Sequence, residues 1–195
     1  MKIGVAISSF KSDDDAINLI QRILGESWPV DGVIVVDSMG EGGIPNFLSE
    51  NNIPNTTYHN FDYNLGSAGN LHNRLELASQ RDWDFVLALN HDALVTKSTL
   101  LAQIEHIALP QLGALYPLKF FPEKAFYDYS GTKEVGPWRA FGPKELPKEA
   151  IIPHIWSSSN GALYSLEPVR KGISPNKNLW FGWDDYLYGL DLRKS

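Results

Sequence analysis

Residues 85–92 have the sequence FVLALNHD, an apolar run that ends in three polar residues. A second run of the same form, GVIVVD, occupies residues 32–37, and a shorter one, IGVAIS, occupies residues 3–8. Runs that are apolar throughout are typical of strands buried on both faces, as in a parallel sheet covered by helices. These stretches therefore predict a buried, mostly parallel sheet.

Apolar residues at helical spacing lie between and after these strands. They are Ala16, Ile17, Ile20, Ile23 and Leu24; Ala68, Leu71, Leu75 and Ala78; and Leu100, Leu101, Ile104 and Ile107. Strand and helix patterns thus alternate, and GALY at residues 161–164 predicts a further strand. The alternation predicts an open α/β sheet with right-handed crossovers.

The size and charge of the chain restrict its class. The length of 195 residues is typical of one domain, 1–195, with a substantial core. With 17 basic and 23 acidic side chains, the net charge is −6. This acidic balance argues against nucleic-acid binding, which needs a basic face to displace counterions from phosphates.

Cysteine content and the terminal sequence narrow the class further. The chain has no cysteine, which excludes a disulfide scaffold, a thiolate zinc site and a cysteine nucleophile. Its start lacks the features of a signal peptide, and no apolar run is long enough to span a bilayer. We therefore expect a cytoplasmic protein.

Residues 118–150 interrupt the alternation with many prolines and aromatic residues. Linkers are poor in aromatic residues, so this segment is predicted to be a functional loop or hairpin insertion.

Polar residues follow three predicted strands, at the edge where ligands bind in open α/β sheets. They are Ser8, Asp37 and the group Asn90, His91 and Asp92. Each alone is equally consistent with a loop or helix cap, but their joint placement predicts a binding site.

The segment NLGSAGN, residues 64–70, is a small-residue turn before a helix. Gly66 allows close approach of a ligand to the backbone, and the helix start offers free N–H groups to an anion. The alternative is a turn that serves only helix packing. The sequence contains neither GxGxxG after the first strand nor GxxxxGK[ST], so nicotinamide-dinucleotide and P-loop sites lose their main support.

Two carboxylate features suggest chemistry. Asp92 follows a buried strand and suits Mg²⁺ or Mn²⁺, with His91 a weaker candidate ligand and a solvated turn the alternative. Asp184 and Asp185 lie in WFGWDDY, residues 180–186. One interpretation is that they interact favourably with the dipole at the start of a helix. The other is that one of them, partly desolvated among aromatic residues, acts as a general base.

In this order the motifs resemble those of family 2 glycosyltransferases with the GT-A fold. The matching elements are VVD, then NLGxAG, then NxD, then GAL, then WDD before a helix, from about residue 2 to residue 193. They are most similar to the branch containing bacterial rhamnosyltransferases and related polysaccharide enzymes. In longer members of that family the chain continues beyond this point, so the resemblance implies a short or missing C-terminal part.

The resemblance implies roles for individual residues. Ser8, Asp37, Asn64, Gly66, Asn90 and Gly161 would line the site of the nucleotide or donor sugar, with Asp37 on the base or ribose. Asp92 matches the last aspartate of the family's DxD motif and would bind the divalent cation, Mn²⁺ or Mg²⁺. Asn90 stands where that motif has its first aspartate.

The resemblance also implies the reaction. Asp185, after Asp184 in the pair, would take a proton from an acceptor hydroxyl, which displaces a UDP or dTDP leaving group with inversion. Trp156 and Trp183 would face a saccharide or glycoconjugate acceptor. A peripheral membrane or partner-subunit association and the oligomeric state are not fixed by the sequence.

Two other functions remain open at this point. A sugar-phosphate nucleotidyltransferase shares the broad fold, but the sequence after the first strand lacks that class's glycine-rich segment with Arg and Lys. A catalytically inactive glycan- or nucleotide-binding module, dependent on a partner, is the second.

Overall fold

The computed structural model describes the chain except residues 26–27, 95, 122–125, 129–150, 152 and 195. Its centre is a six-stranded sheet in the order β3-β2-β1-β4-β8-β5. The strands are β1 (Ile3–Phe10), β2 (Gly32–Ser38), β3 (Thr56–Phe61), β4 (Phe85–Asn90), β5 (Ala114–Leu115) and β8 (Ala162–Ser165). Strands β1 to β4 are mutually parallel, whereas β8 runs antiparallel to β4 and β5. The predicted mostly parallel α/β sheet is confirmed.

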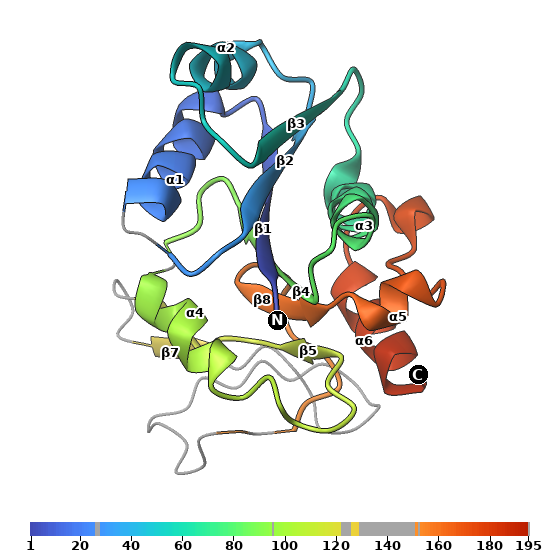
Figure 1. Cartoon of the computed structure of the whole chain (residues 1–195). Helices are drawn as coiled ribbons and strands as arrows, with labels where there is room; N and C mark the ends of the chain where they lie inside the picture. The colour runs from blue at the N-terminus through green and yellow to red at the C-terminus, as the bar shows by residue number, and fades with distance from the viewer. Residues whose placement is uncertain (26–27, 95, 122–125, 129–150, 152, 195) are drawn as a thin grey trace.

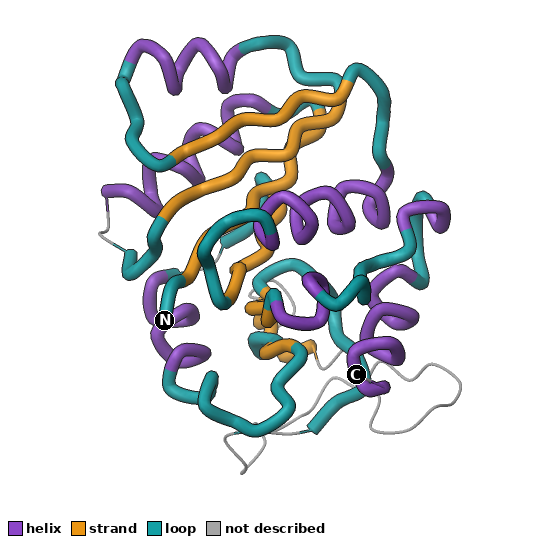
Figure 2. Tube along the Cα trace, turned by 45° about the vertical axis from the view of Figure 1, so that its right-hand side comes forward, coloured by secondary structure: helices purple, strands orange, loops and turns teal. Residues whose placement is uncertain are grey.

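Helices cover both faces of the sheet (Figure 1). One face carries α1 (Asp13–Gly25), α2 (Gly43–Glu50) and α4 (Lys97–Ile104), and the other carries α3 (Gly66–Ser79), α5 (Glu167–Arg170) and α6 (Asp184–Lys194). Alternate residues of each strand point to opposite faces, so the sheet divides the interior into two apolar cores. Val5 and Ile7 pack toward α1, whereas Ala6 packs toward α3. Figure 2 shows the layers from a second direction.

The structure has the core strands and the three helices with apolar spacing at the positions that the sequence predicted, and some of their ends differ. The third apolar helix pattern extends to Ile107, but α4 ends at Ile104. Strand β3 and helix α2 were not predicted. Strand β3 has the sequence TTYHNF at the sheet edge, where an apolar run is not required because one side is open to solvent.

The 118–150 insertion is described only in part. Strands β6 (Lys119–Phe121) and β7 (Phe126–Asp128) form a separate antiparallel pair, as expected of a hairpin. Most of the predicted insertion, residues 122–125 and 129–150, lies outside the described residues.

In the part of the chain that is described, no helix combines the length and the apolar character needed to cross a lipid bilayer.

Candidate functional site

The strand order reverses between β1 and β4, because β2 and β3 extend the sheet from one side of β1 and β8 from the far side of β4. Ser8 and Asn90 are register partners at this point, and the Ser8 hydroxyl donates to Oδ1 of Asn90 at 3.1 Å. The backbone N–H of Asn90 donates to Oδ1 of Asn160 at 3.0 Å. A crevice at such a reversal, beyond the carboxyl ends of the strands, is where open α/β sheets bind ligands.

Asp37 ends β2 beside this point but is fully buried. Its Oδ2 accepts a hydrogen bond from the Tyr58 hydroxyl at 2.8 Å. Burial raises the pKa of Asp37, an effect that the Tyr58 hydrogen bond opposes. Within the described structure Oδ1 of Asp37 has no hydrogen-bond partner, although the Gly40 backbone lies directly over this carboxylate. In this structure the Asp37 carboxylate is therefore not exposed to a nucleotide, and its contact with the base or ribose stays a prediction.

The turn before α3 is held by a short set of contacts. Oδ1 of Asn64 accepts from the N–H of Gly66 at 2.9 Å, and Gly66 has a φ of 65°. The N–H of Ala68 donates to the carbonyl of Trp180 at 3.2 Å. A side chain on Gly66 would overlap that same carbonyl oxygen. Gly66 is thus needed for close packing, against the segment before α6 and not against the sheet as the packing alternative had it, while its contact with a donor remains a prediction.

We expect Gly66→Ala to lower the free energy of unfolding by about 1–3 kcal/mol, because alanine disfavours positive φ and its methyl group overlaps backbone. Thermal unfolding should show a fall of several degrees in Tm. Gly172→Ala is the matched control, since Gly172 has a φ of 85° with open space around it. Equal losses in the two variants would contradict the close-packing role of Gly66.

The acidic pair begins α6 and contacts the start of α3. The Ser67 hydroxyl lies 3.2 Å from both carboxylate oxygens of Asp184, which is buried. Asp185 is partly exposed. Burial, reinforced by the negative charge of Asp185, raises the pKa values of the Tyr116 and Tyr164 hydroxyls. The two carboxylates therefore differ: Asp184 is buried and bonded to Ser67, whereas Asp185 is partly exposed and lies near the Tyr116 and Tyr164 hydroxyls.

Arg74 is a buried cation beside this pair. Its Nη1 donates to the carbonyl of Leu89 on β4 at 2.9 Å and to that of Ala6 on β1 at 3.4 Å. Burial lowers its pKa to about 10, while the charges of Asp185 and Asp184 act in the opposite direction. Arg74 is therefore protonated near neutral pH and compensates negative charge under the site.

Asp92 follows β4 and is exposed. No group of three or more His, Cys, Asp or Glu side chains suited to a metal ion occurs among the described residues. A lone exposed carboxylate suits a hard cation that takes most of its remaining ligands from water and a diphosphate. The donor set thus fits a cation shared with a substrate and not a protein-only metal centre.

The remaining predicted residues have distinct environments. Gly161 is buried. Its N–H donates to the carbonyl of Ala88, and its own carbonyl accepts from Gln103. These bonds hold the start of β8 beside the point where the strand order reverses. Trp183 is exposed, whereas Trp156 is buried. Both rings contact Tyr186 edge-on, at centroid distances of 6.0 and 5.9 Å. Of the two predicted acceptor residues, Trp183 alone presents its ring to solvent, and the acceptor role of each stays a prediction.

The fold thus gathers the predicted residues at one end of the sheet, with Asp184 and Asp185 on the α3 side. Sequence reasoning assigned no role to Ser67, Arg74 or Asn160. Arg74 could have been found, because its spacing from Leu71 and Ala78 places a charge on the apolar face of a helix. Ser67 and Asn160 carry no comparable signal.

No protein-family model and no curated protein matches the sequence. The structure is similar to that of S. aureus TarS 1–349, with a TM-score of 0.66, 17% identity and coverage of 98% of this chain and 55% of that one. The structure of TarS 1–349 in complex with UDP matches with a TM-score of 0.63 and 18% identity. This match covers 97% of this chain and 54% of that one. The structure is also similar to that of a 4-diphosphocytidyl-2C-methyl-D-erythritol synthase, with a TM-score of 0.54 and 12% identity. This match covers 100% of this chain and 85% of the synthase.

These similarities establish the fold as the expected GT-A fold of nucleotide-diphospho-sugar transferases. The chain spans about half the length of TarS 1–349.

Proposed function

We propose that this protein is an inverting glycosyltransferase that moves a sugar from a UDP- or dTDP-sugar to a hydroxyl of a saccharide or glycoconjugate. The observation that carries the proposal is the position of Asp184 and Asp185, attached through Ser67 to the start of α3 at the ligand-binding end of a GT-A sheet. The similar structure of TarS was solved with UDP, which favours a uridine donor. The family 2 type and the rhamnosyltransferase-like branch remain predictions from motif order.

In this proposal Asp185 is the general base. Its carboxylate accepts the proton of the acceptor hydroxyl, the oxygen forms a bond to the anomeric carbon, and the bond from that carbon to the nucleoside diphosphate breaks. Asp184, held by Ser67, fixes the start of α6 and so orients Asp185. Arg74 places positive charge beneath the pair, which favours the ionised form of the base.

The donor occupies the crevice between β1 and β4. Ser8 and Asn90 line it, and the N-terminal end of the α3 dipole favours negative charge nearby, although the N–H groups of Gly66 and Ala68 are already bonded to Asn64 and Trp180. Asp92 would hold Mn²⁺ or Mg²⁺, which supplies charge neutralisation for the leaving diphosphate. A requirement for a cation is consistent with the net charge of −6, since an acidic protein does not attract an anionic donor by its own charge.

Asp92→Asn should abolish most of the Mn²⁺-dependent increase in UDP affinity while leaving the metal-free affinity unchanged, because only the shared cation contacts this carboxylate. Calorimetric titration of UDP with and without Mn²⁺ measures both. Asp62→Asn is the control, since Asp62 is an exposed carboxylate that follows β3, the edge strand separated from β4 by β2 and β1. A Mn²⁺ effect that survives in Asp92→Asn would remove Asp92 from the cation site.

A nucleotidyltransferase is the second candidate, favoured by the similarity to 4-diphosphocytidyl-2C-methyl-D-erythritol synthase. The two reactions release different products. Incubation with UDP-glucose, UDP-N-acetylglucosamine and dTDP-rhamnose should give nucleoside diphosphate through slow transfer to water, whereas CTP or UTP with sugar phosphates should give no pyrophosphate. The opposite result would establish the second candidate, and metal-dependent nucleotide binding without turnover of any donor would favour an inactive binding module.

A further inference from the structure

A cleft of about 310 Å³ lies outside the crevice between β1 and β4. It lies between α3 and the segment around η2 (Lys177–Leu179), and its lining residues are Tyr63, Asn64, Leu65, Gly69, Asn73, Lys177, Asn178 and Trp180. Its volume is at the lower end of the range for small-molecule sites, roughly 300–1,000 Å³. The cleft therefore has room for one sugar-sized ring.

Trp180 forms one wall in an unusual backbone conformation. Its φ and ψ are 59° and −62°, and the N–H of Phe181 donates to the carbonyl of Leu179 at 2.7 Å. This is a γ-turn of the strained type, which non-glycine residues rarely adopt. Strain of this kind persists where the surrounding structure enforces it, and it is concentrated at functional sites.

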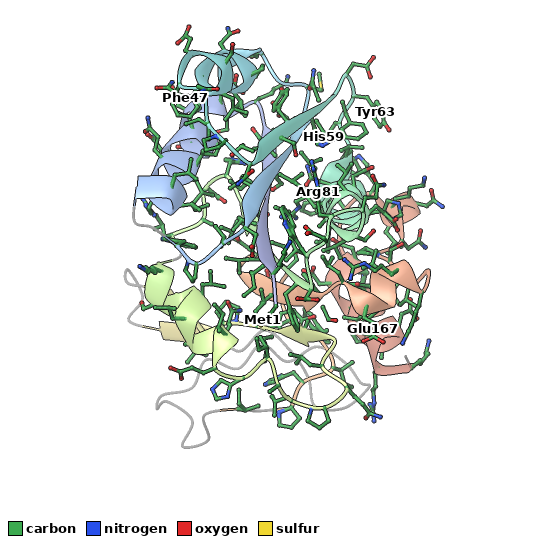
Figure 3. All side chains as sticks on the ribbon, viewed as in Figure 1. Met1, Phe47, His59, Tyr63, Arg81 and Glu167 are labelled. Atoms are coloured by element: carbon green, nitrogen blue, oxygen red, sulfur yellow. The ribbon has the colours of Figure 1, made fainter. Side chains whose placement is uncertain are left out.

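The position of Trp180 is enforced by α3, because its carbonyl accepts from Ala68 and packs against Gly66. Trp180 as a residue is 58% exposed. Tyr63, also 58% exposed, lies just past the end of β3, near the start of α3 (Figure 3). Two aromatic residues thus have apolar surface open to solvent at this cleft, and the backbone of one of them, Trp180, is held by α3.

Amide groups complete the cleft. The Asn73 side chain donates to the carbonyl of Gly69 at 2.7 Å, and its Oδ1 accepts no hydrogen bond from any described residue. Asn178 is exposed, and within the described structure its side-chain amide makes no hydrogen bond. Apolar rings with a few oriented amides match a pyranose ring, which has one face made largely of C–H groups and an edge of hydroxyls.

We propose that this cleft binds a saccharide ring of the acceptor, stacked on Trp180 with its hydroxyls on Asn73 and Asn178. The proposal rests on the proposed glycosyltransferase function. The cleft is joined to the acidic pair, since Ala68, which holds Trp180, follows Ser67, which holds Asp184. A ring bound here would lie outside the donor crevice at Ser8 and Asn90, and Asn64, which lines the cleft, would then contact the acceptor and not the donor.

The test uses the full chain saturated with UDP and Mn²⁺ on an oligosaccharide microarray, followed by calorimetric titration of the best-bound oligosaccharide. Trp180→Gly removes the ring, keeps the carbonyl that Ala68 needs, and tolerates a φ of 59° without strain. We expect its saccharide affinity to fall by roughly tenfold or more, as for a buried aromatic anchor, with UDP affinity and Tm maintained. Tyr63→Ala should weaken saccharide binding as well.

Phe181→Ala is the matched control, because Phe181 is 74% exposed, adjacent in sequence and outside the cleft lining. It should leave saccharide affinity within about twofold of the unmodified chain. Unchanged saccharide affinity in Trp180→Gly, an equal loss in Phe181→Ala, or a parallel loss of UDP affinity in Trp180→Gly would overturn the proposal. If the chain binds UDP but no saccharide, the cleft proposal is overturned and the proposed glycosyltransferase function is not. Failure of the proposed function would instead appear as absent UDP binding and absent donor turnover.

Discussion

Asp185→Asn is expected to lower the rate of UDP-sugar turnover by roughly 10²–10⁴-fold, because the amide cannot accept the proton that the attacking hydroxyl loses. UDP affinity should stay within about twofold, since the proposed donor site is the crevice between β1 and β4 and not the start of α6. The rate is measured as UDP release, with water as acceptor and then with any saccharide that the cleft binds. Affinity is measured separately by calorimetry.

Asp191→Asn is the matched control for this substitution. Asp191 is on the same helix, is exposed and pairs with Lys194, so its loss should leave turnover unchanged. Asp184→Asn differs from both, because Asp184 is buried against Ser67 and its substitution should lower stability as well as rate. Undiminished turnover in Asp185→Asn would move the base elsewhere, and Asp184 would be the first candidate.

The sequence predicted the centre of this fold because buried strands need continuous apolar residues. Val33 to Val36 and Val86 to Leu89 are buried on both faces, and the strands continue past these runs only to Ser38 and Asn90. Strand β3 has no such run, because it pairs on one side only. The antiparallel direction of β8 could not be predicted from the sequence either. Its four residues are all buried, and burial is the same for parallel and antiparallel pairing.

The site was predictable where position along a strand determines position in space. Ser8 lies near the carboxyl end of β1 and Asn90 ends the neighbouring β4, so their contact follows from the topology. Contacts between distant segments do not follow in this way. Ser67 meets Asp184, and Trp180 meets Ala68, only because α6 packs beside α3, and no pattern in either segment encodes that neighbour. The burial of Asp37 under Gly40 likewise depends on a loop conformation.

Arg74→Met should have the largest effect on stability, a loss of about 3–5 kcal/mol in the free energy of unfolding. The substitution leaves the carbonyl of Leu89 without its 2.9 Å donor and removes the cation that compensates Asp184 and Asp185. Urea denaturation measures the loss. Arg22→Met, at a partly exposed position near the end of α1, is the control and should change stability by less than about 0.5 kcal/mol.

We expect Arg74 to affect the pH dependence of turnover as well. A base is inactive when protonated, so the rate falls on the acidic side as Asp185 takes up its proton. Removing a nearby positive charge favours the protonated carboxylic acid, so the midpoint of the acidic limb should move to higher pH in Arg74→Met. Arg74→Lys keeps the charge but not the planar donor group, so it should lose stability with a smaller shift of the midpoint. A purely structural Arg74 would give the same midpoint in all three proteins, because packing alone does not change the proton affinity of the base.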